Sequence, residues 1–233
     1  MTKVTYLHHS GFMVETEKNC LVFDYYTDGG KFDNIDLSAF NGKNVFVFVS
    51  HFHQDHYDRN VIFKWKDMNV RYILSKDCMY DKSLENVTVV NANKGYIIDG
   101  VAIETLKSTD EGVAYIVHSD GITIYHAGDL NWWHWNGEPE EDNEYYKKTF
   151  QDEMKYLEGK KIDLAFMLLD PRQEKDFYLG MDDFMRMVGA DVVFPMHFWG
   201  DFEVTDRFKV LECAKDYKDR IVKISTTGES FEI

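Results

Sequence analysis

The chain alternates between short apolar runs typical of β-strands and polar turns. Residues 45–49 form an unbroken run of β-forming apolar side chains, which predicts a strand buried on both faces. Between two later runs lies Asp120-Gly121, which predicts a tight hairpin turn. The other runs predict strands at 4–7, 12–15, 20–25, 71–74, 87–90, 96–98, 101–105, 113–117, 122–125, 162–169, 191–195 and 221–224.

Helical spacing of apolar residues predicts four helices among these strands. One is expected after Asp58, its N-cap, and a final one after Thr205, also as a cap. The remaining two are expected at 145–158 and 182–188. With 233 residues, the chain is long enough for a full core, and it has no repeat or linker. We therefore expect a single α/β domain over residues 1–233.

Three histidines and an aspartate directly follow the buried strand, as His51, His53, Asp55 and His56. In an extended chain the first three of these side chains point the same way, whereas His56 needs a turn to join them. Open α/β sheets bind ligands at the carboxyl ends of their strands, and neutral imidazole with carboxylate suits zinc, iron or manganese. The loop is a candidate metal site; the alternative is a polar loop whose histidines are satisfied by hydrogen bonds.

Two later strand ends carry the same kinds of groups. Gly128 permits an unusual backbone angle and is followed by Asp129, although Gly-Asp pairs commonly just form turns. His197 follows the expected strand at 191–195. Both residues are candidate metal ligands.

Aromatic and histidine residues near these strand ends are candidates for substrate contacts. His9 either faces the substrate or is a buried, hydrogen-bonded histidine. Trp133 and Trp199 are candidate pocket walls, and His134 is a candidate catalytic residue that reaches the substrate. The alternative for the Trp-rich segment is a hydrophobic cluster under a long loop.

Composition limits the partners that we expect. The formal net charge of −15 disfavours nucleic acid and acidic membrane surfaces, which require Lys and Arg. The chain has three distant cysteines, and it shows neither a signal-peptide pattern nor an apolar run of membrane-spanning length. We expect a cytoplasmic protein with a small-molecule substrate; the sequence leaves the oligomeric state open.

In this order and with these gaps, the His-rich loop, the Gly-Asp pair and the late His resemble the metallo-β-lactamase superfamily over nearly the whole chain. The most specific segment is the run from His51 to His56. The chain looks closest to the branch of small metal-dependent hydrolases that includes the ascorbate-6-phosphate lactonase-like proteins. The residues that carry this closer resemblance are His9-Ser10-Gly11-Phe12, Ile124 to Asp129 and Pro195-Met196-His197.

This resemblance implies a four-layer αββα sandwich with two divalent metal ions at one edge of the sheets, zinc first and manganese or iron as alternatives. His51 and His53 would bind the first metal, Asp129 would bridge both, and the second would be bound by Asp55, His56 and His197. Two cations lower the pKa of a water molecule, so hydroxide forms near neutral pH and attacks an ester, lactone or phosphoester. Asp55 would help to orient this nucleophile.

One departure from the family pattern concerns the first metal. The family usually supplies another His from a segment between the His-rich loop and the Gly-Asp strand, but residues 57–117 contain none. Asp110 lies in the matching segment and could replace the imidazole, because carboxylate is also a metal ligand. His118 is an unlikely substitute, since it belongs to the hairpin at the far end of its strand.

Three functions therefore compete. The first is a metal-dependent hydrolase of a small substrate. The second is a redox enzyme of the same fold with a single iron, which a weakened first site would suit. The third is a non-catalytic metal-binding or regulatory protein on a degenerate hydrolase scaffold.

Overall fold

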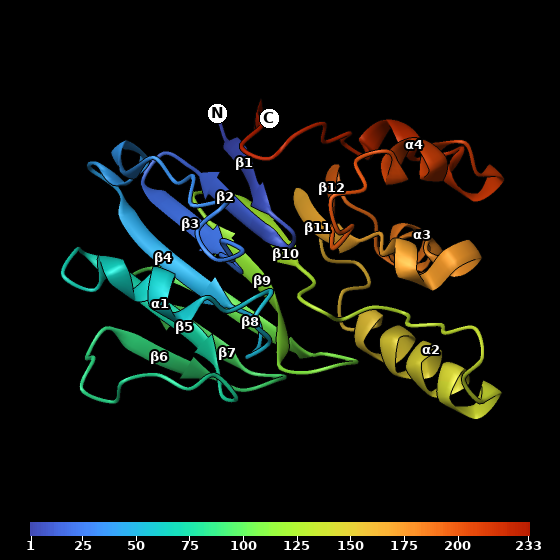
Figure 1. The fold of residues 1–233 in the computed structure, drawn as a ribbon, viewed down its shortest axis with the longest axis horizontal. Helices are drawn as coiled ribbons and strands as arrows, with labels where there is room; N and C mark the ends of the chain where they lie inside the picture. The colour runs from blue at the N-terminus through green and yellow to red at the C-terminus, as the bar shows by residue number, and fades with distance from the viewer.

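The computed structural model describes residues 1–233 and consists of two β-sheets packed face to face, with helices outside them (Figure 1). The first sheet has seven strands in the order β13-β1-β2-β3-β4-β5-β6. Its strands are β1 (Lys3–His8), β2 (Gly11–Glu15), β3 (Asn19–Phe23), β4 (Asn44–Val49), β5 (Val70–Ser75), β6 (Val87–Val90) and β13 (Ser230–Glu232). Strands β3 to β6 pair in parallel, and β1, β2, β3 and β13 pair in antiparallel fashion.

The second sheet has six strands in the order β12-β11-β10-β9-β8-β7. Its antiparallel part is joined to β11 and β12 through β10, and these last three strands run in parallel. The strands are β7 (Gly95–Ile98), β8 (Val101–Lys107), β9 (Val113–Ser119), β10 (Ile122–His126), β11 (Leu164–Leu168) and β12 (Val192–Met196).

Two hydrophobic cores fix the layers. The larger one, of 47 buried residues, fills the space between the sheets and continues under α2 (Glu140–Met154), α3 (Leu179–Met187) and α4 (Val204–Lys209). The smaller one, of 16 residues, lies under the short helix α1 (Arg59–Ile62) on the outer face of the first sheet. This arrangement confirms the expected αββα sandwich. None of its helices has the length and apolar character needed to cross a membrane.

Most of the strands were predicted correctly from the sequence, because both sheets bury apolar side chains on their inner faces. All five residues of β11 and the last five of β4 are buried. The hairpin at Asp120-Gly121 is confirmed: both residues have positive φ, 48° and 83°, as a tight primed turn requires.

The helix after Asp58 was predicted too long. Helix α1 has only four residues and continues as a 3-10 turn over Phe63–Trp65. Asp58 makes no side-chain capping bond; its Oδ2 instead accepts from Thr27 Oγ1 at 2.7 Å. Burial of Ile62 and Trp65 in the smaller core, rather than helix length, holds this segment.

Other boundaries also differ from the sequence prediction. Helix α2 begins at Glu140, because the acidic run after Pro139 supplies its first turn, where carboxylates favour the helix dipole. Thr205 lies inside α4 rather than capping it. The expected strand at 221–224 is wrong: Ile221 makes one isolated bridge to Val193. The strand that closes the first sheet is β13, beside β1, so the two chain ends lie together (Figure 1).

Candidate metal centre

The loop after β4 places its polar side chains in two directions. The backbone N–H groups of His56 and Tyr57 both donate to the carbonyl of His53, at 3.0 and 2.9 Å, which closes a tight turn. His51 and His53 precede this turn and lie together, with His51 Nε2 2.9 Å from His53 Nδ1. Asp55 and His56 follow the turn and belong to a different group of side chains. The chain is therefore not extended from His51 through Asp55, as we had expected.

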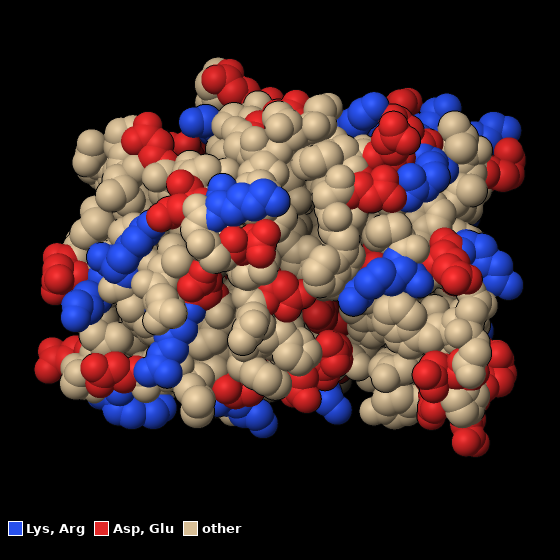
Figure 2. Space-filling view, viewed as in Figure 1, with Lys and Arg blue, Asp and Glu red and all other residues tan.

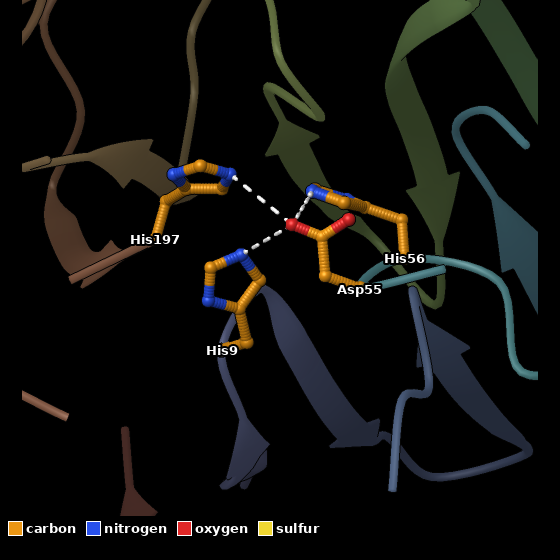
Figure 3. Close-up of side chains that lie close together, drawn as sticks. All are labelled: His9, Asp55, His56 and His197. Carbon is orange, nitrogen blue, oxygen red and sulfur yellow. Dashed lines mark ion pairs between the residues drawn. The ribbon is translucent and has the colours of Figure 1, made fainter. Parts of the chain in front are cut away.

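Three chain segments bring a second group of side chains to Asp55. Its Oδ2 lies 3.2 Å from His9 Nε2 and 4.0 Å from Nε2 of both His56 and His197. Figure 3 shows these four side chains pointing toward one another, from the β1–β2 turn, the loop after β4 and the end of β12. Their ligand atoms all lie within 4.8 Å of one another, as metal coordination requires.

Asp129 lies between this group and the pair formed by His51 and His53. One of its carboxylate oxygens, Oδ2, is 3.5 Å from His51 Nε2. The other, Oδ1, is 3.2 Å from His56 Nε2 and 3.4 Å from His197 Nε2. With His51 and His53, Asp129 forms the other cluster whose ligand atoms are close enough to hold a metal ion.

Parallel strands explain this convergence. The carboxyl ends of β3, β4, β10, β11 and β12 lie at the same edge of the two packed sheets (Figure 1). Each of these ends is followed by a chemically active group, namely Asp24, His51, Asp129, Asp170 and His197. The site is therefore assembled from strand ends that are far apart in the sequence.

Two buried carboxylates fix the orientation of the imidazoles, and sequence reasoning assigned neither of them a role. Asp24 Oδ2 lies 2.8 Å from His56 Nδ1, and Asp170 Oδ2 lies 2.9 Å from His197 Nδ1. Each carboxylate accepts the proton of Nδ1 and leaves Nε2 facing the cluster, as is common for metal-binding histidines. Their position in the sequence was the available indication of a role at the site, because Asp24 and Asp170 closely follow buried strands.

The backbone is strained at several of these positions. His9, Asp24, His197 and Trp199 have positive φ angles, between 41° and 61°, which side-chain-bearing residues seldom adopt. Gly128 has a φ of 53°, and a Cβ there would lie 2.8 Å from Ser50 Cβ. Such strain persists only where the surroundings hold it, and it is typical of functional sites.

Burial and the neighbouring charges shift the pKa values of the cluster in opposite directions. Burial lowers the pKa of His9 to about 3 and of His51 to about 4, so both imidazoles are neutral at pH 7. Burial also disfavours the cationic form of His56, but Asp129 and Asp24 outweigh it and raise its pKa. Burial works against ionisation of Asp129, yet the surrounding histidines hold its pKa well below the ordinary value.

The donor atoms of this cluster fit divalent metal ions. Four buried polar atoms, the Nε2 atoms of His9, His56 and His197 and Oδ1 of Asp129, make no hydrogen bond of acceptable geometry, although they lie within ion-pair distance of one another or of Asp55. A buried polar atom left without a partner costs about 1–3 kcal/mol, so a cluster of them in a folded protein calls for a ligand. Imidazole nitrogen and carboxylate oxygen are the donors that zinc accepts.

A cavity of about 240 Å³ opens onto the cluster. Trp133 forms one wall: it is buried, stacks on Trp135 at 5.4 Å, and donates from Nε1 to the backbone carbonyl of Asp129. The other lining residues are His53, Asp55, Asp110, Asp129, Trp135, Tyr146, Arg172 and His197. Figure 2 shows one face of the molecule, with acidic side chains near its middle and basic ones beside them.

Comparison with known proteins identifies the family. Residues 3–134, more than half of the chain, match the family model described as "Beta-lactamase superfamily domain". The chain belongs to the metallo-β-lactamase superfamily. The metallo-β-lactamase fold protein YhfI from Bacillus subtilis has the same fold, with a TM-score of 0.68 over the full length of both chains at 15% identity.

Two curated relatives of this superfamily carry the name UPF0173 metal-dependent hydrolase. The one from Korarchaeum cryptofilum is 28% identical over 136 residues, which are 55% of this chain and 60% of that protein. The one from Pelotomaculum thermopropionicum is 25% identical over 99% of this chain and all of that protein. The matched region thus covers about 60% of the Korarchaeum protein and the whole of the Pelotomaculum protein.

Within this superfamily site, His9 lies among the possible metal ligands. The sequence left open a substrate contact or a buried histidine; His9 is buried, and its Nε2 faces Asp55 within that group. The bulged register between β1 and β2, at Tyr6 and His8, presents His9 to the cluster. In the sequence, His9 was marked by its place at a strand end and by the segment His9-Ser10-Gly11-Phe12.

The other expected site residues lie around the cavity or beside it. Asp110 lines the cavity, but about half of its side chain is exposed, and its Oδ2 is 3.8 Å from His53 Nδ1, outside the two clusters. His134 does not line the cavity, and its Nε2 lies 3.8 Å from Asp176 Oδ2. Trp199 packs on His9 with ring centroids 4.5 Å apart and lines a second cavity. His118, as expected, lies elsewhere, beside Glu104.

Proposed function

We propose that this protein is a metal-dependent hydrolase that acts on a small ester, lactone or phosphoester with two divalent metal ions, zinc first. The observation that carries the proposal is the set of four buried atoms without a hydrogen bond, which converge from three histidines and Asp129. The names of the relatives support the reaction class. The lactone class follows from the resemblance to the ascorbate-6-phosphate lactonase-like branch, which stays a prediction.

Each metal would have its own set of protein ligands. His51 and His53 would hold one ion, and His56, His197 and Asp55 the other, with Asp129 shared between them. His9 is a further candidate ligand for the second ion, since its Nε2 faces the same point. We assign no metal to Asp110; at the cavity wall it is positioned to contact water or substrate.

The reaction follows from the chemistry of such a site. Divalent cations held there lower the pKa of a water molecule and polarise the oxygen under attack. Asp55, partly exposed to the cavity, would orient the attacking water and accept its proton. Asp24 and Asp170 keep the imidazoles fixed, so that little reorganisation is needed during the reaction. We leave His134 out of this mechanism.

The domain organisation, the cellular location and the kind of substrate are also part of the proposal. We propose that the whole chain acts as one domain in the cytoplasm, where a reducing environment suits its three free cysteines. The substrate would be a small molecule, because the cavity at the metal centre is only about 240 Å³. Nucleic acid remains disfavoured by the net charge of −15.

The test is to strip the purified protein with a chelator, measure hydrolysis of a panel of esters, lactones and phosphoesters, and then restore zinc. We expect activity to disappear and return, and His56→Ala to lose at least a hundredfold in kcat/KM together with bound metal. His118→Ala is the matched control, because this histidine is paired with Glu104 outside the site. Full turnover after complete removal of metal would refute the proposal, and iron with oxygen consumption would favour the redox alternative.

A further inference from the structure

The cavity at the metal centre contains one positively charged side chain among three carboxylates. Asp55, Asp110 and Asp129 line it together with Arg172, and no other Lys or Arg does so. Arg172 follows Pro171 in the 3-10 turn after β11, so it comes from the same strand end as Asp170. A guanidinium group stays charged at any pH that the protein tolerates. Arg172 is therefore a permanent positive charge in the lining of an otherwise acidic cavity.

The orientation of this guanidinium is fixed on three sides. Its Nε donates to Asp170 at 2.9 Å, and its Nη2 donates to the same carboxylate. The central carbon, Cζ, lies 4.8 Å from the ring centroid of Trp199 and 5.7 Å from that of Trp135. Cation–π contacts of this kind hold the group in place.

One edge of the group remains available. A guanidinium has five N–H donors in a planar fork, and Asp170 occupies the edge formed by Nε and Nη2. The edge formed by Nη1 and the second N–H of Nη2 is the one that can receive another oxyanion in bidentate geometry. Because Asp170 also binds His197 at 2.9 Å, this edge stands at a set position relative to the metal cluster.

We infer that Arg172 is a specificity-determining residue, and that the substrate is a small molecule that carries a carboxylate or phosphate group at its non-reacting end. This inference rests on the proposed hydrolase function. The anionic group sits on the free edge of Arg172, and the bond to be cleaved lies over the His and Asp cluster. A cavity of about 240 Å³ is below the usual 300–1,000 Å³ of drug-sized ligand pockets, so the substrate is short.

A purely structural role for Arg172 makes a different prediction. In that case the residue only holds Asp170, and thereby His197, so its loss weakens reaction with every substrate alike. Anion recognition instead weakens reaction with anionic substrates selectively. The two roles are separated by the ratio of kcat/KM values for two esters that share a leaving group and differ in charge.

The experiment compares 4-nitrophenyl acetate with 4-nitrophenyl hemisuccinate on the zinc-loaded protein. We expect wild type to prefer the hemisuccinate, and Arg172→Met to lower the ratio of kcat/KM, hemisuccinate over acetate, by at least tenfold. We expect Arg172→Lys to keep only part of the preference for the hemisuccinate, because an ammonium group lacks the planar fork. Arg186→Met is the matched control, since Arg186 binds Asp182 on the surface of α3. No preference in wild type, or an unchanged ratio in Arg172→Met, would overturn the inference.

A binding titration keeps this inference separate from the proposed reaction. Succinate is added to the zinc-loaded protein while tryptophan fluorescence is followed, because Trp135 and Trp199 flank Arg172. We expect saturable binding that weakens at least tenfold in Arg172→Met and is unchanged in Arg186→Met. If the zinc-loaded protein hydrolyses no member of the substrate panel but succinate binds in this way, the proposed function fails and the anion site stands. Equal succinate binding in wild type and Arg172→Met refutes the anion site.

Discussion

Asp24 accepts a hydrogen bond from Nδ1 of His56 at 2.8 Å, and both side chains are completely buried. The same carboxylate receives the backbone N–H and the hydroxyl of Ser50, both at 2.7 Å, at the point where β4 ends. Asp24, which directly follows β3, thus fixes both the start of the His-rich loop and the orientation of the His56 imidazole within it. We therefore expect metal binding at the cluster to depend on this support as well as on the ligands.

The first prediction concerns this support. Asp24→Asn keeps the size of the side chain but removes the charge that holds the proton on His56 Nδ1. Loss of such a partner typically costs 10–100-fold in metal affinity, and we expect a loss in that range. The measurement is a competition titration with a zinc-binding dye.

Asp163→Asn is the matched control for Asp24→Asn. Asp163 also accepts a backbone N–H, that of Thr123 at 2.8 Å, but at the opposite end of the second sheet. We expect its zinc affinity to equal that of wild type. An Asp24→Asn protein that binds zinc as tightly as wild type would show that the carboxylate is not needed for orientation.

The second prediction concerns the segment that covers His51. Gly112 has a φ of 70°, and a Cβ there would lie 2.0 Å from the carbonyl oxygen of Ser50 and 2.6 Å from His51 Cβ. Gly112→Ala therefore forces the backbone and His51 apart. We expect a lower melting temperature and weaker metal binding.

Gly100→Ala provides the comparison for Gly112→Ala. Gly100 also has a positive φ, 86°, but nothing lies within 4 Å of its added Cβ. Its alanine variant reports the backbone cost alone, about 1 kcal/mol in the free energy of unfolding. If both variants lose the same stability and both bind zinc normally, the close approach at Gly112 does not matter to the site.

The third prediction concerns the far end of the sandwich. Asp120 Oδ2 accepts from Thr16 Oγ1 at 2.6 Å and from the backbone N–H of Lys18 at 2.9 Å, so it joins hairpins of the two sheets. Partial burial would raise its pKa, but these bonds lower it below the ordinary 3.8. A depressed carboxylate pKa contributes stability that is present above the unfolded value and is lost as the pH falls through the folded value.

Asp120→Asn should therefore lose about 1 kcal/mol in the free energy of unfolding at pH 7, the usual contribution of such bonds near a surface. We expect the difference from wild type to shrink as the pH is lowered below about 4. Denaturant unfolding at several pH values measures it. A difference that stays constant down to pH 3 would contradict the assignment of the effect to the ionised carboxylate.

The sequence predicted the strands and the convergence of the candidate metal ligands for the same physical reason. Parallel strands between two faces need continuous apolar runs such as 45–49, and their carboxyl ends meet at one edge, so His51, Asp129 and His197 were expected together. The helix after Asp58 was overestimated because its apolar spacing reflects contact with the smaller core and not helix length.

Other features depend mainly on tertiary contacts. His9 reaches the cluster through the bulge between β1 and β2, and β13 forms only because β1 offers a free edge. Asp24 and Asp170 are single carboxylates without a motif, and their roles appear only once the imidazoles that they orient are placed. The exposed position of Asp110 likewise could not be read from its neighbours in the sequence.

The central claim is that separate strand ends form one metal-binding cluster, and anomalous diffraction from a crystal of the zinc-loaded protein tests it most directly. We expect two zinc peaks about 3.5–4 Å apart, one about 2.0–2.2 Å from the Nε2 atoms of His56 and His197, and the other beside His51, with Asp129 between them. A loaded crystal with no anomalous peak within coordinating distance of these residues would contradict the account.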